Sequence, residues 1–126
     1  MIERESKVPK EVRTLVCGGR DYDDVDYVYQ VLDRYVPHSL IISGHAKGAD
    51  SIAEMYADER GIPLKIFPAD WDKFGKSAGY HRNAQMLEEG KPDRVIAFPG
   101  GRGTALMVSL AQDRGVVVLD HRTKDF

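Results

Sequence analysis

The sequence has one cysteine, no long apolar run and no excess of positive charge, and each of these absences excludes a class of protein. The single Cys17 cannot build an intramolecular disulfide framework, and its position in an apolar run predicts a buried, unreactive thiol. No stretch approaches the roughly 18 apolar residues that suggest a membrane span, and residues 1–13 lack the apolar segment of a secretion signal. We therefore expect a soluble, cytoplasmic protein with no membrane partner.

Charge and histidine content exclude two further kinds of partner. The 18 lysines and arginines are balanced by 20 acidic residues, so the chain lacks the strong positive field that non-specific nucleic-acid binding needs. The four histidines do not have the spacing of metal ligands, and no cluster of cysteines or carboxylates supplements them. The sequence therefore predicts neither a nucleic-acid partner nor a metal site.

Short apolar runs alternate with segments of helical periodicity along most of the chain. Residues 1–11 are charged and aperiodic, so they are predicted to form a tail, and residues 12–126 to form one domain. The alternation predicts a three-layer, Rossmann-like, doubly wound α/β sheet of about five mainly parallel strands with helices on both faces. The predicted strands are 14–17, 40–43, 64–67, 94–98 and 116–119, and the predicted helices are 25–36, 50–60, 80–89 and 104–114.

Three of the predicted strands lead directly into glycine-rich segments that each carry a cation. In a doubly wound sheet, ligands bind beyond the carboxyl ends of strands, where glycine lets the backbone approach a ligand and helix N-terminal amides bind phosphate. A single loop of this kind has a purely steric explanation, but three at one edge favour phosphate recognition. The predicted phosphate-binding residues of these loops are Gly18, Gly19, Arg20, Ser43, Gly44, Lys47, Gly100, Gly101, Arg102, Gly103 and Thr104.

Neither common nucleotide fingerprint is complete. The chain lacks a P-loop G-x-x-x-x-G-K-[ST], and the first glycine turn lacks the spaced glycines of a dinucleotide G-x-G-x-x-G. These two absences argue against a kinase-like ATPase and a nicotinamide dehydrogenase.

Four polar residues in these loops have more than one interpretation. Asp21 and Asp50 are candidate catalytic carboxylates or partners of a ribose or base, although an acidic residue at a helix start is also an ordinary cap. Thr104 is expected to cap its helix and to share a phosphate contact. His45 is either an acid–base group or a side chain at the edge of the pocket.

The irregular stretch 69–79 carries the sole tryptophan. Trp71 is the candidate contact for a nucleotide base, because an aromatic ring beside a cation suits a stacked base. The alternative is that Trp71 and Phe74 plug the end of the sheet, and for Phe74 we prefer the plug. Arg82 and Asn83, in the following helical segment, are the stronger candidates for ligand binding.

With these motifs in view, the sequence resembles the SLOG superfamily, in particular its small bacterial and phage branch of YspA-like, cpYpsA-related domains. The resemblance implies a Rossmann-like fold that binds a nucleotide or a nucleotide-derived, ADP-ribose-like molecule, often as a homodimer, in a bacterial or phage-infected cell. It implies no required cofactor, although a nucleotide can stay bound. The matching motifs are GGRDY at 18–22, SGHAKGAD at 43–50, PADW at 68–71, GKSAGYHRN at 75–83 and AFPGGRGTALM at 97–107.

The chain departs from the more distant LOG-type phosphoribohydrolases, which cleave the base from nucleoside monophosphates. Their PGG-x-GT motif is followed by a glutamate that assists cleavage, and Met107 stands at that place here. Of their arginine–lysine pair, Arg82 matches the arginine, and Asn83 stands at the place of the lysine. Methionine can neither transfer a proton nor stabilise an oxocarbenium ion. The close branch also usually has glycine in place of His45, and proline is common in place of Tyr80.

Two functions follow as expectations. The first is binding of a nucleotide-derived small molecule through the glycine-rich loops. The alternative is a nucleotide hydrolase that acts on an N-glycosidic or phosphate bond, with Asp21 or Asp50 in place of the LOG glutamate.

Overall fold

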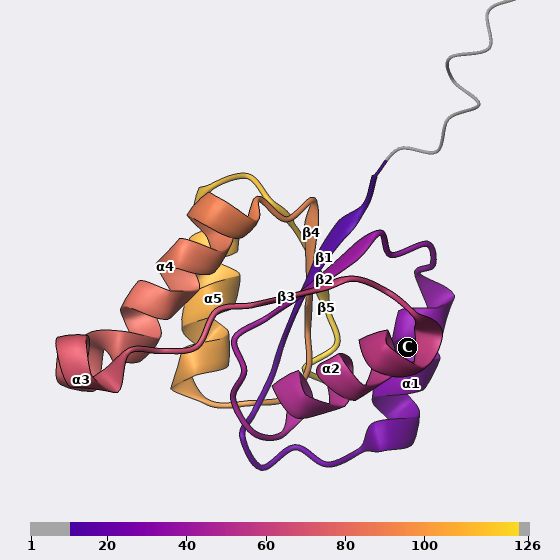
Figure 1. The fold of residues 1–126 in the computed structure, drawn as a ribbon, viewed down its shortest axis with the longest axis horizontal. Helices are drawn as coiled ribbons and strands as arrows, with labels where there is room; N and C mark the ends of the chain where they lie inside the picture. Colours follow the sequence, from indigo (N-terminus) through magenta and orange to yellow (C-terminus); the bar gives the residue numbers. More distant parts are fainter. Residues whose placement is uncertain (1–10, 124–126) are drawn as a thin grey trace, which may run out of the picture.

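The computed structural model describes residues 11–123 and places five parallel strands in one sheet between two layers of helices (Figure 1). The strands are β1 (Arg13–Cys17), β2 (Leu40–Ser43), β3 (Leu64–Ile66), β4 (Arg94–Ala97) and β5 (Val117–Asp120), and the long helices are α1 (Val25–Arg34), α2 (Ala49–Arg60), α4 (Ala78–Gly90) and α5 (Arg102–Asp113). Helices α1 and α2 lie on one face and α4 and α5 on the other. This is the predicted doubly wound α/β architecture. Of the predicted tail, only Glu11 falls within the described residues.

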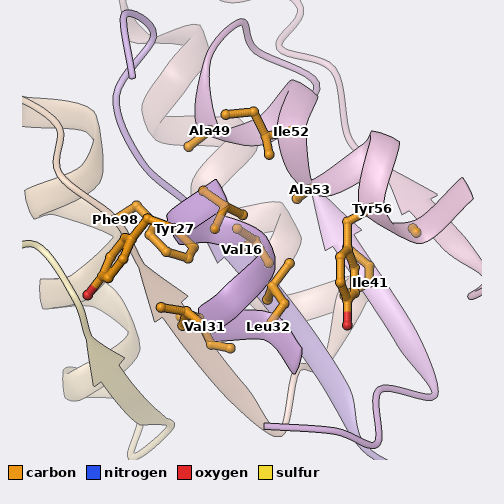
Figure 2. Close-up of a cluster of buried hydrophobic side chains, with 13 residues drawn as sticks. Val16, Tyr27, Val31, Leu32, Ile41, Ala49, Ile52, Ala53, Tyr56 and Phe98 are labelled. Carbon is orange, nitrogen blue, oxygen red and sulfur yellow. The ribbon is translucent and has the colours of Figure 1, made fainter. Parts of the chain in front are cut away.

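The core on the α1–α2 face is built from every second residue of the central strands. Val16 of β1, Ile41 of β2 and Ile96 of β4 are fully buried there. They pack with Tyr56 of α2 and with Phe98, which directly follows β4 (Figure 2). Each buried apolar side chain of this size contributes roughly 1.5–3 kcal/mol to folding.

A second core lies on the α4–α5 face and uses the intervening residues of the same strands. Leu15, Ile42 and Val95 are fully buried and pack with Met86 of α4 and Met107 of α5. Because the central strands are covered on both faces, their sequences are almost continuously apolar, which is why they were visible in the sequence.

The apolar face of helix α1 packs against the sheet. Val28, Val31 and Leu32 recur at helical spacing and are fully buried against the sheet. The helix ends at Arg34, two residues earlier than predicted, and Pro37 disfavours helical backbone at the residue before it.

The segment 69–79 is not wholly irregular, so that prediction was wrong. It contains the short helix α3 (Trp71–Phe74) and a 3-10 turn, η2 (Gly75–Ser77). The side chain of Asp70 starts α3, because its Oδ1 accepts the backbone N–H of Lys73 at 3.0 Å. A four-residue helix that depends on one cap leaves no periodic pattern in the sequence.

The strand order β3-β2-β1-β4-β5 positions the functional site. The chain leaves β1 in one direction through β2 and β3, then returns to the other side of β1 with β4. Thr14 of β1 accordingly pairs with Ile41 on one side and Arg94 on the other. Ligands of doubly wound sheets bind where the strand order reverses, which is here the carboxyl edge between β1 and β4.

Candidate functional site

A cavity of about 810 Å³ opens at the carboxyl edge of the sheet. Its volume lies in the range of small-molecule and cofactor sites, roughly 300–1,000 Å³. Of the predicted ligand-binding and catalytic residues, the cavity wall includes Gly18, Gly19, Arg20, Asp21, Gly44, Lys47, Asp50, Trp71, Arg82, Asn83, Gly101, Arg102, Gly103 and Thr104. Ser43 and Gly100 are not among the residues that line the cavity.

Backbone hydrogen bonds join the loops after β1, β2 and β4. The N–H of Gly19 donates to the carbonyl of Pro99 at 2.7 Å, and the N–H of Ala49 donates to the carbonyl of Gly19 at 3.1 Å. Gly48 has a φ of 75°, and a Cβ there would lie 2.1 Å from the carbonyl oxygen of Gly19. A Cβ on Gly100 would lie 2.2 Å from Thr104 Oγ1. Gly48 and Gly100 are therefore required by the packing of the loops themselves.

Gly101 and Gly103 have no such steric explanation. Apart from the immediate neighbours and, for Gly103, the backbone of its own helix, a Cβ at either position would meet no atom of residues 11–123 within 4 Å. Gly103 lies in the first turn of α5, where glycine costs up to about 1 kcal/mol relative to alanine. Both glycines line the cavity, so the space beside them belongs to the pocket.

The helices that begin at the cavity are suited to an anion. The N-cap residues of α2 and α5 are Gly48 and Gly101, and in the described part of the chain neither helix has a side-chain cap. The first N–H groups of such helices attract negative charge. Arg20, Lys47 and Arg102 supply exposed cations on the same wall.

Thr104 does not have its predicted capping role. Helix α5 begins at Arg102, so its N-cap is Gly101 and Thr104 lies inside the first turn. The side chain is buried, and its Oγ1 lies beneath Gly100. Met107 is also buried on the cavity wall and supplies no carboxylate.

Arg82 and Asn83 connect two of the loops. Arg82 Nη1 donates to the carbonyl of Gly44 at 2.5 Å, and its Nε donates to Asn83 Oδ1 at 3.1 Å. Asn83 Nδ2 donates to the carbonyl of Gly103 at 3.2 Å. Burial lowers the pKa of Arg82, and the nearby Asp50 opposes this shift. Arg82 and Asn83 thus hold the loop after β2 against α5, and both residues also line the cavity.

The two predicted carboxylates differ in environment. Asp50 is 6% exposed, and its Oδ2 accepts the backbone N–H of Ala46 at 3.1 Å. It is not the N-cap of α2, so the capping interpretation was wrong. Burial raises the pKa of Asp50 to about 6, although its hydrogen bond to Ala46 and the charge of Arg82 act in the opposite direction. Asp21 is exposed on the cavity wall.

His45 is held by a carboxylate that the sequence did not reveal. Its Nδ1 lies 3.1 Å from both oxygens of Glu54. Ser43 Oγ donates to Glu54 Oε2 at 2.7 Å and accepts the backbone N–H of His45 at 3.1 Å. His45 has a left-handed φ of 61°, which costs a non-glycine residue roughly 1–2 kcal/mol. The only indication in the sequence that Glu54 faces this loop is its position one helical turn after Asp50.

Cys17 is buried at the cavity, and burial raises the pKa of its thiol, as expected for an unreactive cysteine. Among residues 11–123, no group of three or more histidine, cysteine or acidic side chains is arranged to hold a metal ion. Within the same residues, no helix combines the length and apolar character needed to cross a membrane.

The sequence is similar to that of a known family and to that of a phage protein. A family model described as "YspA, cpYpsA-related SLOG family" matches residues 12–74. The chain is 32% identical to "Gene 61 protein" of Mycobacterium phage D29 over 123 aligned residues. This alignment covers 89% of this chain and 98% of the phage protein. A solved phosphoribosylglycinamide formyltransferase from Anaplasma phagocytophilum aligns with a TM-score of 0.44 and 18% identity over 88% of this chain. The match spans 49% of that longer protein.

Proposed function

Because this chain belongs to the YspA, cpYpsA-related SLOG family, we propose that its cavity binds a nucleotide or a nucleotide-derived, ADP-ribose-like small molecule. The phosphate lies against the loops that follow β1, β2 and β4. The observation that carries this proposal is the open space beside Gly101 and Gly103 at the start of α5. At Gly103, glycine costs helix stability without relieving a clash, and a ligand that approaches the backbone accounts for it.

The charge around this space supports a phosphate in particular. The first turn of α5 contains no acidic residue and begins with Arg102. Arg20 and Lys47 add positive charge from the other two loops. Phosphate on unpaired helix N–H groups with flanking cations is a recurrent arrangement in α/β proteins.

Calorimetry tests the proposal with AMP, ADP, ADP-ribose and ribose 5-phosphate, and with adenosine as the phosphate-free control. We expect the phosphate-bearing probes to bind and adenosine to bind more weakly. Gly103→Ala introduces a Cβ into the space and is expected to weaken phosphate binding at least about tenfold while leaving the free energy of unfolding unchanged or slightly raised. Gln112→Ala, an exposed α5 position outside the cavity, is the matched control. Silence of every phosphate-bearing probe would overturn the proposal.

A second candidate function is hydrolysis of the bound nucleotide at an N-glycosidic or phosphate bond. It is favoured by the buried Asp50 carboxyl, whose raised pKa of about 6 keeps part of it protonated near neutral pH, as a general acid requires. His45, oriented by Glu54, is the candidate base on the same cavity wall. Incubation with the nucleotide panel and assay of free base and phosphate tests this. Release that Asp50→Asn does not reduce would exclude Asp50 as the acid.

A further inference from the structure

Part of the cavity wall is aromatic, and this part comes from α3 and α4 rather than from the glycine-rich loops. Trp71 of α3 and Tyr80 of α4 both line the cavity, and their side chains remain 57% and 51% exposed. A tryptophan that plugged the sheet would be buried, so the plug interpretation does not hold for Trp71. Within the described chain, α3 has no buried residue at all. The fold therefore gains little from the apolar surface of these two rings.

Another ring holds α3 in place. Phe74 stacks on His81 of α4, with ring centroids 3.9 Å apart and an interplanar angle of 23°. Tyr80 packs edge-on against the same histidine, at 5.9 Å and 89°. Phe74 is only half-buried, so the predicted plug of the sheet does not hold for this residue either. Its stack on His81 instead fixes α3 on α4 next to Tyr80.

Gly79, next to Tyr80, leaves open space on the cavity wall. It lines the cavity in the first turn of α4, and a Cβ there would touch nothing within 4 Å in residues 11–123 beyond its neighbours and the backbone of its own helix. Its φ is not in the left-handed region that favours glycine. As at Gly103, glycine is neither sterically required nor favourable for the helix.

We propose that Trp71 and Tyr80 form a clamp for the aromatic base of the bound nucleotide, with the base over Gly79 and the phosphate at the start of α5. This inference rests on the proposed function, and it fixes the direction in which the ligand lies. Indole and phenol rings bind flat bases by stacking, with little dependence on base identity. Lys76 on the same wall adds a cation.

A second, smaller hollow supports the inference that the indole of Trp71 is accessible to a ligand. It measures about 420 Å³, is formed by residues 68–72 and shares Pro68, Ala69 and Trp71 with the main cavity. Trp71 therefore borders two hollows. The clamp is expected to strengthen binding of a base-containing ligand roughly five- to hundredfold over its base-free counterpart.

Trp71 is the only tryptophan in the chain, so its fluorescence reports directly on the clamp. The experiment titrates the full-length protein with AMP, ADP-ribose and ribose 5-phosphate and follows both tryptophan emission and calorimetric affinity. We expect the two base-containing probes to change the emission and to bind more tightly, whereas ribose 5-phosphate binds without an emission change.

Variants then assign the effect to the two rings. Trp71→Ala and Tyr80→Ala are expected to reduce AMP affinity towards that of ribose 5-phosphate and to leave ribose 5-phosphate binding unchanged, while Trp71→Phe and Tyr80→Phe retain most of the difference. Val117→Ala, an exposed apolar position on β5, is the control. Equal affinity for AMP and ribose 5-phosphate would overturn the clamp and leave the phosphate site intact. Silence of all three probes would overturn the proposed function and the clamp together.

Discussion

The Cα of Gly48 lies so close to the carbonyl of Gly19 that a Cβ on Gly48 would come within 2.1 Å of that oxygen. The same carbonyl accepts the backbone N–H of Ala49, so the contact joins the loops after β1 and β2 at the floor of the cavity. A side chain at Gly48 must therefore separate these loops.

We predict that Gly48→Ala lowers the free energy of unfolding by more than about 3 kcal/mol, because backbone strain at its φ of 75° adds to the clash. Gly61→Ala is the matched control. Gly61 also has a positive φ, of 66°, but a Cβ there would meet no atom of residues 11–123 within 4 Å, so it should lose only about 1–2 kcal/mol. Urea unfolding of both variants measures the difference, and equal losses would contradict the loop contact.

Asp50→Asn is expected to stabilise the protein at pH 7. Burial raises the folded-state pKa from 3.8 to about 6, so the charged form costs up to about 3 kcal/mol when the protein folds. Asparagine keeps an oxygen for the N–H of Ala46 and removes that charge. The gain should shrink as the pH falls from about 6 to about 4, because folded Asp50 then binds a proton that the unfolded chain does not. If Asp50→Asn unfolded more easily than the unsubstituted protein both at about pH 6 and at about pH 4, the prediction would be refuted.

His38 is expected to make the protein less stable in mild acid. Its Nε2–H donates to the carbonyl of Leu32 at 2.7 Å, and its Nδ1 lies 2.8 Å from Thr14 Oγ1 and 3.0 Å from Arg94 Nη2. The ring is buried and neutral, and burial lowers its pKa. A lowered histidine pKa means that stability is lost as the pH falls through the unfolded value of 6.5.

The decrease in unfolding free energy with falling pH is best measured in the Asp50→Asn variant, where the opposing titration of Asp50 is absent. Unfolding free energy should fall between pH 7 and pH 5, and His38→Gln should make that fall smaller. Some fall should remain, because burial also lowers the pKa of His121. An unchanged slope in His38→Gln would show that His38 is not the responsible group.

His45→Gly is predicted to stabilise the fold by up to about 1 kcal/mol, because glycine adopts the left-handed φ of His45 without strain. The exposed contact with Glu54 that is lost is worth less than about 1 kcal/mol. Thermal unfolding measures the gain. If the protein hydrolyses a nucleotide, the same variant should lose turnover, which would mark the strain at His45 as serving function rather than folding.

The sequence predicted those features that one element determines locally. Strand β2 was predicted at its observed bounds, Leu40–Ser43, because its apolar run is short and isolated. Features that depend on distant partners were not predictable. The link between Glu54 and His45 requires that α2 face the β2 loop, and Ser43 was assigned to the ligand although it supports that link. Sequence spacing also could not distinguish Gly100, which is packed, from Gly103, which faces open space.

Among the strands of residues 11–123, β1 is synthesised before the others and yet lies in the middle of the sheet, between β2 and β4. Until β4 leaves the ribosome, one side of β1 has no hydrogen-bonding partner, and the N–H of Gly19 has no Pro99 carbonyl to bind. A nascent chain at that stage presents an open strand edge, which is a template for incorrect pairing. The cavity at the edge of the sheet is therefore a late product of synthesis, because it is complete only when the second half of the chain has closed the sheet.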